Sequence, residues 1–139
     1  MITDELYDLL IDPTGPTAGG RIFTPDTPEN YTYVGPYLVI SGVGGTSEED
    51  LTGGIGVANE RFQFSCRAKV EDGGNLTCRS MAEQIRVTLQ GVAAQDGKLI
   101  EGASVASRGI DLYDSNLNLH VVLADYEVWY SEQPTSAPD

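Results

Sequence analysis

The sequence predicts a single α+β domain, in which a mainly antiparallel, twisted sheet carries two helices packed on one face. Residues 57–70 and 117–130 alternate apolar and polar residues with the period of two that a half-buried strand requires. Residues 76–89 instead repeat apolar residues every three or four positions, which is the period of an amphipathic helix. The segments follow in the order helix, strands, helix, strands, without an internal repeat, and this order favours the α+β class.

The length and composition are those of one ordinary domain. A chain of 139 residues with 40% apolar residues buries roughly two-thirds of its unfolded surface. We expect residues 1–131 to form this domain and the proline-containing residues 132–139 to be a flexible tail. The acidic N-terminus lacks the features of a signal peptide, and no apolar run approaches the length of a membrane span. The sequence therefore predicts synthesis in the cytoplasm and no membrane partner.

The charge is strongly unbalanced, with 21 acidic and 8 basic residues and a net charge of −13. Such a surface repels nucleic acid and anionic lipid, so binding to DNA or to a membrane is disfavoured. Two interpretations stay open. The charge keeps the protein soluble, or it presents an acidic surface past which DNA slides without being held.

The N-terminal third contains a helix and two extended segments. Residues 3–11 predict a short helix with acidic residues at its positive end, and Pro13 stops it. A loop follows as far as residue 20, and then a brief extended segment over residues 21–24 that later prolines interrupt. Residues 36–43 predict a strand that is apolar almost throughout, which suggests that both of its faces are covered.

Residues 44–56 predict a long, mobile, solvated hairpin arm, because glycines at both ends flank the acidic run Glu48-Glu49-Asp50. The arm lacks the glycine pattern of a dinucleotide-binding or phosphate-binding loop and the Asp/Asn spacing of a calcium loop. We therefore expect neither a cofactor nor a metal there.

The strand over residues 57–70 has two faces of opposite character. One face is apolar and predicts a contribution to the core: Phe62, Phe64, Cys66, Ala68 and Val70. The other face is polar and, unusually for this chain, basic: Arg61, Gln63, Ser65, Arg67 and Lys69. A basic face in an acidic protein predicts contact with solvent or with an acidic partner.

The helix over residues 76–89 packs an apolar stripe on the sheet, and Gly91 is placed to end it. A strand over residues 104–112 follows, and Asp114-Ser-Asn116 supplies hairpin-turn residues before the last strand. The apolar parity of that last strand changes near Leu123. Either a β-bulge lies there, or both faces of the strand are covered. The strand ends in an aromatic group that includes Trp129, on which something must pack.

No catalytic constellation is present in the sequence. His120 is the only histidine and lies within a strand, no serine or cysteine has the pattern of a nucleophile elbow, and the acidic residues cluster in turns. Cys66 and Cys78 are too few for a disulfide framework, so we expect free buried thiols. The sequence predicts no catalytic, cofactor-binding or metal-binding residue.

The order and spacing of short motifs across residues 3–131 resemble the tail completion or tail terminator proteins of long-tailed, lambda-like bacteriophages. The strongest motif is the terminal Tyr126-Glu-Val-Trp-Tyr130, whereas residues 94–106 match little. The motifs that carry the resemblance are Leu6-Tyr-Asp-Leu-Leu, Arg21-Ile-Phe, Pro36-Tyr-Leu-Val-Ile, Phe62-Gln-Phe64, Ala82-Glu-Gln-Ile-Arg86 and Asp125-Tyr-Glu-Val-Trp-Tyr130.

The resemblance implies a structural virion protein of the tail or neck that assembles in the host cytoplasm. A hexameric ring of it would end polymerisation of the tail tube and join the tail to the head connector, while DNA passes through the bore without specific binding. Its partners would be other copies, the tail tube protein and the connector or stopper protein. The candidate interface residues are Glu48, Glu49, Asp50, Arg61, Arg67, Lys69 and Trp129.

Two alternatives stay open. The first is a neighbouring structural role, that of a head-completion or stopper protein of the neck. The second belongs to another class, a small ligand-binding or enzymatic α+β domain whose pocket would contain Tyr126, Trp129 or His120.

Overall fold

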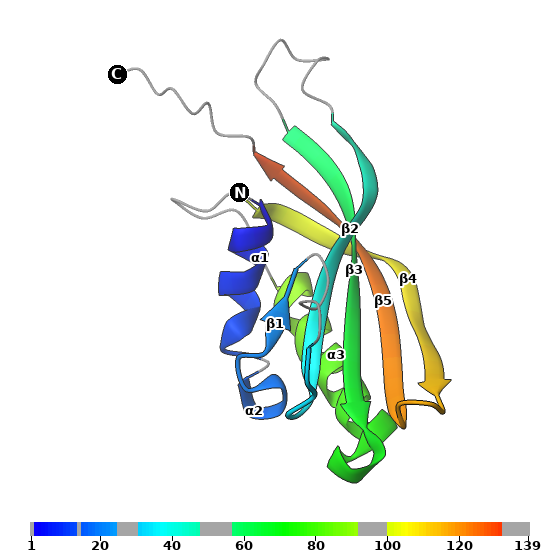
Figure 1. The fold of residues 1–139 in the computed structure, drawn as a ribbon. Coiled ribbons are helices and arrows are strands. Elements are labelled where there is room, and N and C mark those ends of the chain that lie inside the picture. The colour runs from blue at the N-terminus through cyan, green and yellow to red at the C-terminus, as the bar shows by residue number, and fades with distance from the viewer. Residues whose placement is uncertain (1, 14, 25–30, 48–56, 92–99, 132–139) are drawn as a thin grey trace.

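The computed structural model describes residues 2–13, 15–24, 31–47, 57–91 and 100–131, and these residues form one sheet with helices on one side (Figure 1). The elements in chain order are α1 (Ile2–Ile11), α2 (Gly15–Ala18), β1 (Ile22–Phe23), β2 (Tyr37–Ser47), β3 (Val57–Lys69), the 3-10 turn η2 (Val70–Asp72), α3 (Gly74–Gln90), β4 (Ile100–Asp114) and β5 (Leu119–Ser131).

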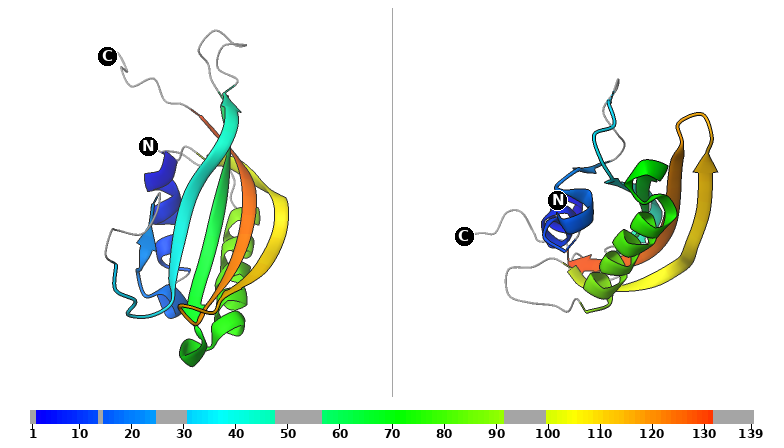
Figure 2. Two further views of the ribbon diagram at one scale, coloured as in Figure 1. Left: turned by 45° about the vertical axis from the view of Figure 1, so that its right-hand side comes forward. Right: turned by 90° about the horizontal axis from the view of Figure 1, so that it is seen from below.

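The sheet has the strand order β1-β2-β3-β5-β4. Three of its four strand pairs are antiparallel, and only the short β1 runs parallel to β2, through Ile22↔Leu38 and Phe23↔Val39. The right panel of Figure 2 shows the sheet curving around α1 and α3. The predicted α+β class with a mainly antiparallel sheet and helices on one face is confirmed.

β3 and β5 form the centre of the sheet and pair without a register shift from Val57↔Ser131 to Lys69↔Leu119. Directly paired residues point to the same face, so this ladder determines the face of every side chain on both strands. A bulge near Leu123, the first of the two alternatives, is therefore absent from the β3–β5 ladder. The irregularities lie in β4, in its pairing with β5, and at Val43 of β2.

The second interpretation of the parity change is confirmed, because both faces of β5 are partly covered. Val122 and Tyr126 are buried on the face that meets the helices, while Leu119 is buried on the opposite face. Val121 and Leu123 share that opposite face and are half-buried. Leu119, Val121 and Leu123 therefore belong to a second surface and do not contribute to the main core.

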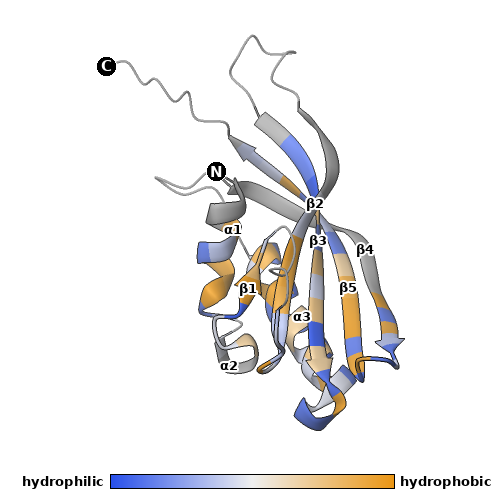
Figure 3. Ribbon diagram, viewed as in Figure 1, coloured by the Kyte–Doolittle hydropathy of each residue, from blue (hydrophilic) through white to orange (hydrophobic). Residues whose placement is uncertain are grey.

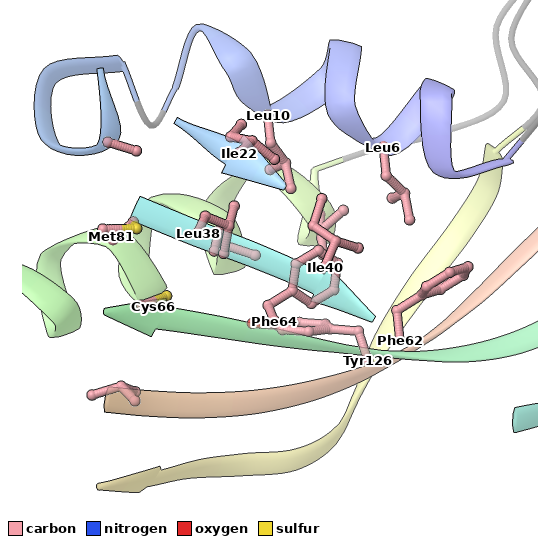
Figure 4. Close-up of a cluster of buried hydrophobic side chains, with 14 of the residues drawn as sticks. Leu6, Leu10, Ile22, Leu38, Ile40, Phe62, Phe64, Cys66, Met81 and Tyr126 are labelled. Carbon is pink, nitrogen blue, oxygen red and sulfur yellow. The ribbon is translucent and has the colours of Figure 1, made fainter. Parts of the chain in front are cut away.

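The main core lies between the sheet and the helices (Figure 4). α3 directs its predicted stripe at the sheet, and α1 adds two fully buried leucines. The fully buried large side chains of this core come from every layer: Leu6, Leu10, Leu38, Ile40, Phe62, Phe64, Met81, Ile85, Leu89 and Val128. Phe64 also makes an edge-to-face contact with Tyr126, with ring centroids 5.6 Å apart.

Several predicted boundaries differ from the structure. Residues 44–47, predicted to belong to the arm, continue β2 and pair with β3 from Gly44↔Arg61 to Ser47↔Ala58. A glycine-rich backbone also forms the hydrogen bonds of a ladder. A search for apolar periodicity does not detect such a strand, because glycine has no side chain. The rest of the predicted arm lies outside the described residues. α2 occupies part of the predicted loop after Pro13, and β4 begins earlier than predicted, at Ile100.

Val70, predicted to face the core, is 53% exposed and belongs to η2. The chain leaves the sheet there because Gly73 adopts φ +98° and turns it into α3. Gly74, at φ +52°, lies against His120, and an added Cβ would come within 2.9 Å of His120 Cδ2. These two glycines therefore position η2 and α3 against the last strand.

We expect Phe64→Ala to lower the free energy of unfolding by ~3–5 kcal/mol, because it removes a fully buried ring and leaves a cavity. Urea denaturation followed by circular dichroism measures this change. Leu76→Ala is the matched control, since Leu76 is 78% exposed, and its effect should stay within ~0.5 kcal/mol. Equal effects of the two substitutions would contradict the assignment of Phe64 to the core.

Candidate interaction surface

The face of the sheet opposite α1 and α3, called here the outer face, carries the predicted basic residues. Arg61, Arg67 and Lys69 are on this face of β3 and are paired across the ladder with Glu127, Val121 and Leu119 of β5. The three cations, called here the basic row, are all partly exposed. The polar and basic side predicted for the strand over residues 57–70 is thus confirmed for β3, which ends at Lys69.

Arg61 differs from the other two cations because its charge is neutralised. Its guanidinium lies 3.3 Å from the carboxylate of Asp125, which is on the same face of β5. Its Nε is buried and has no hydrogen-bond partner among the described residues. Arg61 therefore contributes less positive charge to an incoming partner than its place in the row suggests.

Arg67 and Lys69 are held by aromatic rings. The Arg67 guanidinium lies 5.7 Å from the centre of the Tyr37 ring, and its Nε donates a hydrogen bond of 2.8 Å to Ser65 Oγ. The Lys69 ammonium lies 5.0 Å from the centre of the Tyr33 ring. Neither makes an ion pair within the described part of the chain. A cation–π contact orients a cation without cancelling its charge, so both remain able to attract a carboxylate.

These rings belong to an aromatic cluster that sequence reasoning missed. Its ring centroids are separated by 4.9 Å for Phe23 and Tyr31, 5.9 Å for Phe23 and Tyr37, and 5.2 Å for Tyr31 and Tyr37. Tyr33 joins at 6.0 Å from Tyr37. The cluster lies on the outer face of β1 and β2, where Tyr37 and Val39 are buried. The only sequence signal was the spacing of Tyr31 and Tyr33 before a predicted strand.

The Tyr33 hydroxyl fastens this cluster to the end of β3. It donates a hydrogen bond of 2.5 Å to Asp72 Oδ2 and accepts one of 3.0 Å from the backbone N–H of Lys69. Burial, together with the hydrogen bond to Asp72, raises the pKa of Tyr33 above its usual value. Tyr33 therefore positions the backbone of Lys69 as well as its ammonium group.

An apolar stripe adjoins the basic row on the outer face. It consists of Ile110 and Leu112 of β4, which are 53% and 48% exposed, and the half-buried Val121 and Leu123 of β5. The register joins them directly, through Ile110↔Leu123 and Leu112↔Val121. Figure 3 shows the apolar colour on the adjacent ends of β4 and β5. The outer face thus combines apolar and cationic groups.

The remaining predicted interface residues lie elsewhere or were not described. Trp129 is half-buried and paired with Asn59, two residues along β5 from the partner of Arg61 and ten from the partner of Lys69, so it adjoins only the Arg61 end of the basic row. The predicted aromatic group at this end of β5 is divided between faces, because Tyr126 enters the core while Trp129 does not. Tyr130 donates a hydrogen bond of 2.9 Å to Glu60 Oε1. The acidic residues 48–50 lie outside the described residues.

The groups capable of chemistry are used in packing. Cys66 and Cys78 are free and buried, as predicted, and burial raises the pKa of both thiols, that of Cys78 to about 11. Cys78 Sγ donates a hydrogen bond of 3.3 Å to the carbonyl of His120, whose ring lies 4.7 Å from that of Tyr113. Within the described ranges, no group of three or more His, Cys, Asp or Glu residues is arranged to hold a metal ion.

None of the helices in the described segments combines the length and the apolar character needed to cross a membrane.

Comparison with known proteins identifies relatives for nearly the whole chain. The family model described as "Tail completion protein gp17" matches residues 9–131. Among solved structures, the chain is similar to a chain of the virion of a native gene transfer agent particle, with a TM-score of 0.61 and 14% sequence identity. That similarity covers 88% of this chain and 84% of the other and shows a shared fold. No curated protein matches the sequence.

We expect Tyr33→Phe to cost about 1 kcal/mol at pH 8, because it removes both hydrogen bonds of the hydroxyl. The pKa of Tyr33 is raised in the folded state, so the protonated hydroxyl adds to the free energy of unfolding. This contribution is fully present below the unfolded pKa of about 10 and is lost as the pH rises further. The stability difference between wild type and variant should therefore shrink between pH 9 and pH 11 in urea denaturation.

Tyr113→Phe is the matched control for this prediction. It removes an exposed hydroxyl that bonds Asn118 at 2.8 Å, and we expect a change within ~0.5 kcal/mol. A Tyr33→Phe variant as stable as this control would show that the hydroxyl does not fasten the cluster.

Proposed function

Because the chain belongs to the tail completion protein gp17 family, and so has a structural role in a phage tail, we propose that its copies form a hexameric ring at the head-proximal end of the tail tube. The ring ends polymerisation of the tube and joins the tail to the connector of the head. The observation that carries this proposal is the family match, which extends from α1 to the end of β5 and includes every strand of the outer face.

The charges of the outer face support association between copies. The chain has a net charge of −13, yet Arg67 and Lys69 make no ion pair among the described residues. Glu48, Glu49 and Asp50 supply three consecutive negative charges between β2 and β3. We assign these two regions as complementary patches. A cyclic ring uses two different patches on each subunit, one given to each neighbour.

The surplus of acidic residues suits the passage of DNA. A basic bore would hold phosphates through the release of counterions, whereas an acidic bore would repel them and leave the DNA free to move. We propose that some of the surplus acidic side chains line the bore of the ring. A high-resolution ring structure with a neutral or basic bore would overturn this part of the proposal.

We expect the purified protein to form rings with a central hole under negative-stain electron microscopy, and a matching oligomeric mass in size-exclusion chromatography with light scattering. Purified tail tubes incubated with the protein should carry one ring at one end and cease to elongate. Tubes that continue to grow in the presence of excess protein would overturn the terminating role.

We expect Arg67→Glu combined with Lys69→Glu to raise the concentration at which the rings dissociate by ~10-fold or more, because like charges then meet the acidic segment. The matched control is Arg79→Glu combined with Arg86→Glu, which makes the same change in net charge on α3. Analytical ultracentrifugation at several salt concentrations measures both variants, and the wild-type rings should weaken as salt screens the attraction. Unchanged assembly of the Arg67 and Lys69 variant would contradict the role of the basic row.

A further inference from the structure

We propose that the apolar stripe of one copy is the docking site for residues 48–56 of the neighbouring copy, with Leu51 and Ile55 seated on Ile110 and Leu112. This inference rests on the proposed ring and identifies the interface that builds it. The basic row would bind the acidic residues of the same segment, so one surface recognises both the charges and the apolar side chains.

The apolar stripe is exposed to solvent in the single copy. Ile110 and Leu112 are 53% and 48% exposed, and Val121 and Leu123 extend the apolar surface onto β5. β4 is the last strand in the sheet order, so no further strand of the described sheet lies beside it. Single exposed apolar residues are common, but adjacent ones on an edge strand are typical of an interaction site.

The register places positive charge directly beside this apolar surface. Leu112 pairs with Val121, and Val121 pairs with Arg67, so a cation and an exposed leucine are two strands apart, or ~10 Å. Lys69 lies at the end of the same row, beside Leu119. The complementary ligand is therefore a segment in which acidic residues precede an apolar one by a few positions.

Residues 48–56 have this pattern in their sequence, Glu-Glu-Asp-Leu-Thr-Gly-Gly-Ile-Gly. Glu48 stands three residues before Leu51, and three extended residues span ~10 Å, which equals the separation of Arg67 and Leu112 across the sheet. Elsewhere in the sequence, the C-terminal residues 132–139 are acidic at both ends but contain no large apolar residue. The charge and the apolar content together favour residues 48–56 as the occupant.

The occupant must come from another copy, because the chain cannot reach its own stripe. Residues 48–56 are attached to Ser47 and Val57, and Ala58 is nine residues along β3 from Arg67, a distance of ~30 Å. Nine residues tethered at both ends reach at most ~15 Å. Figure 1 shows the β2 and β3 ends that bear this segment at the opposite end of the sheet from the β4–β5 hairpin.

A donor region and a receiving surface on one subunit are two different patches, as a head-to-tail contact between copies requires. They join copies head to tail, which closes into a ring when the rotation between neighbours permits. This geometry agrees with the cyclic assembly proposed above.

Sedimentation velocity on three single variants tests the inference. We expect Leu112→Asp, which damages the receiving surface, and Leu51→Asp, which damages the donor segment, each to sediment as a monomer. Val87→Asp is the matched control, because Val87 is an apolar residue on α3 that is 57% exposed, close to the 48% of Leu112, and this variant should still form rings. Circular dichroism confirms that each variant is folded. An equimolar mixture of Leu112→Asp and Leu51→Asp should form dimers and no larger assembly. Leu112→Asp retains an intact donor segment and Leu51→Asp retains an intact receiving surface, so only one contact can form between them.

A covalent trap gives a second measurement. Leu51→Cys and tagged Leu112→Cys are mixed and treated with diamide, which takes up the two hydrogens of the thiols as the disulfide forms. We expect a reducible heterodimer, which tagged Val87→Cys in place of Leu112→Cys should not give. Cys66 and Cys78 are buried and should not compete.

The failures of the two proposals are distinguishable. Wild-type protein that sediments only as a monomer would overturn the ring, and this inference with it. Wild-type rings that persist in Leu112→Asp and Leu51→Asp would leave the ring standing and overturn the assignment of its interface.

Discussion

The unbroken ladder between β3 and β5 is the interaction on which the rest of the structure depends. It runs from Val57↔Ser131 to Lys69↔Leu119 and assigns a face to every side chain of both strands. A slip of one residue would move Phe62 and Phe64 out of the core and place the cations against the helices. The buried aromatic rings and the desolvation of misplaced charges therefore oppose any other register.

The same register gives the outer face its chemical character. The cations of β3 cannot reach Glu83 of α3, which lies on the other side of the sheet, so they interact with the groups of the outer face. Arg61 is paired with Asp125, whereas Arg67 and Lys69 lie over the rings of Tyr37 and Tyr33. Because an aromatic ring leaves the charge uncancelled, two positive groups remain available on a molecule with a net charge of −13.

A structural role in a phage tail explains why the reactive side chains serve packing. Cys66 and Cys78 have raised pKa values that keep them protonated at neutral pH, and the Cys78 thiol donates a hydrogen bond to the backbone carbonyl of His120. His120 packs against Gly74 at the start of α3. The described part of the chain also presents an apolar stripe and a basic row on the outer face of the sheet.

The sequence by itself determined the elements whose partners are local. The alternation predicted for residues 57–70 appears in the structure as far as Lys69, and the stripe of α3 appears as predicted, because each pattern reports one buried face. The turn at Asp114 also follows from its own chemistry, since its carboxylate accepts a hydrogen bond of 3.0 Å from the N–H of Asn116.

Only the tertiary structure decided which faces of β5 are covered and what gathers on the outer face. Leu119, Val121 and Leu123 look like core residues in the sequence, yet the pairing with β3 places them opposite the main core. The aromatic cluster draws on β1, on the segment before β2, and on β2 itself, and the apolar stripe requires β4 and β5 side by side. Periodicity shows how side chains alternate along one strand. Whether a face of that strand becomes core or interface depends on which distant part of the chain, or which other molecule, packs against it.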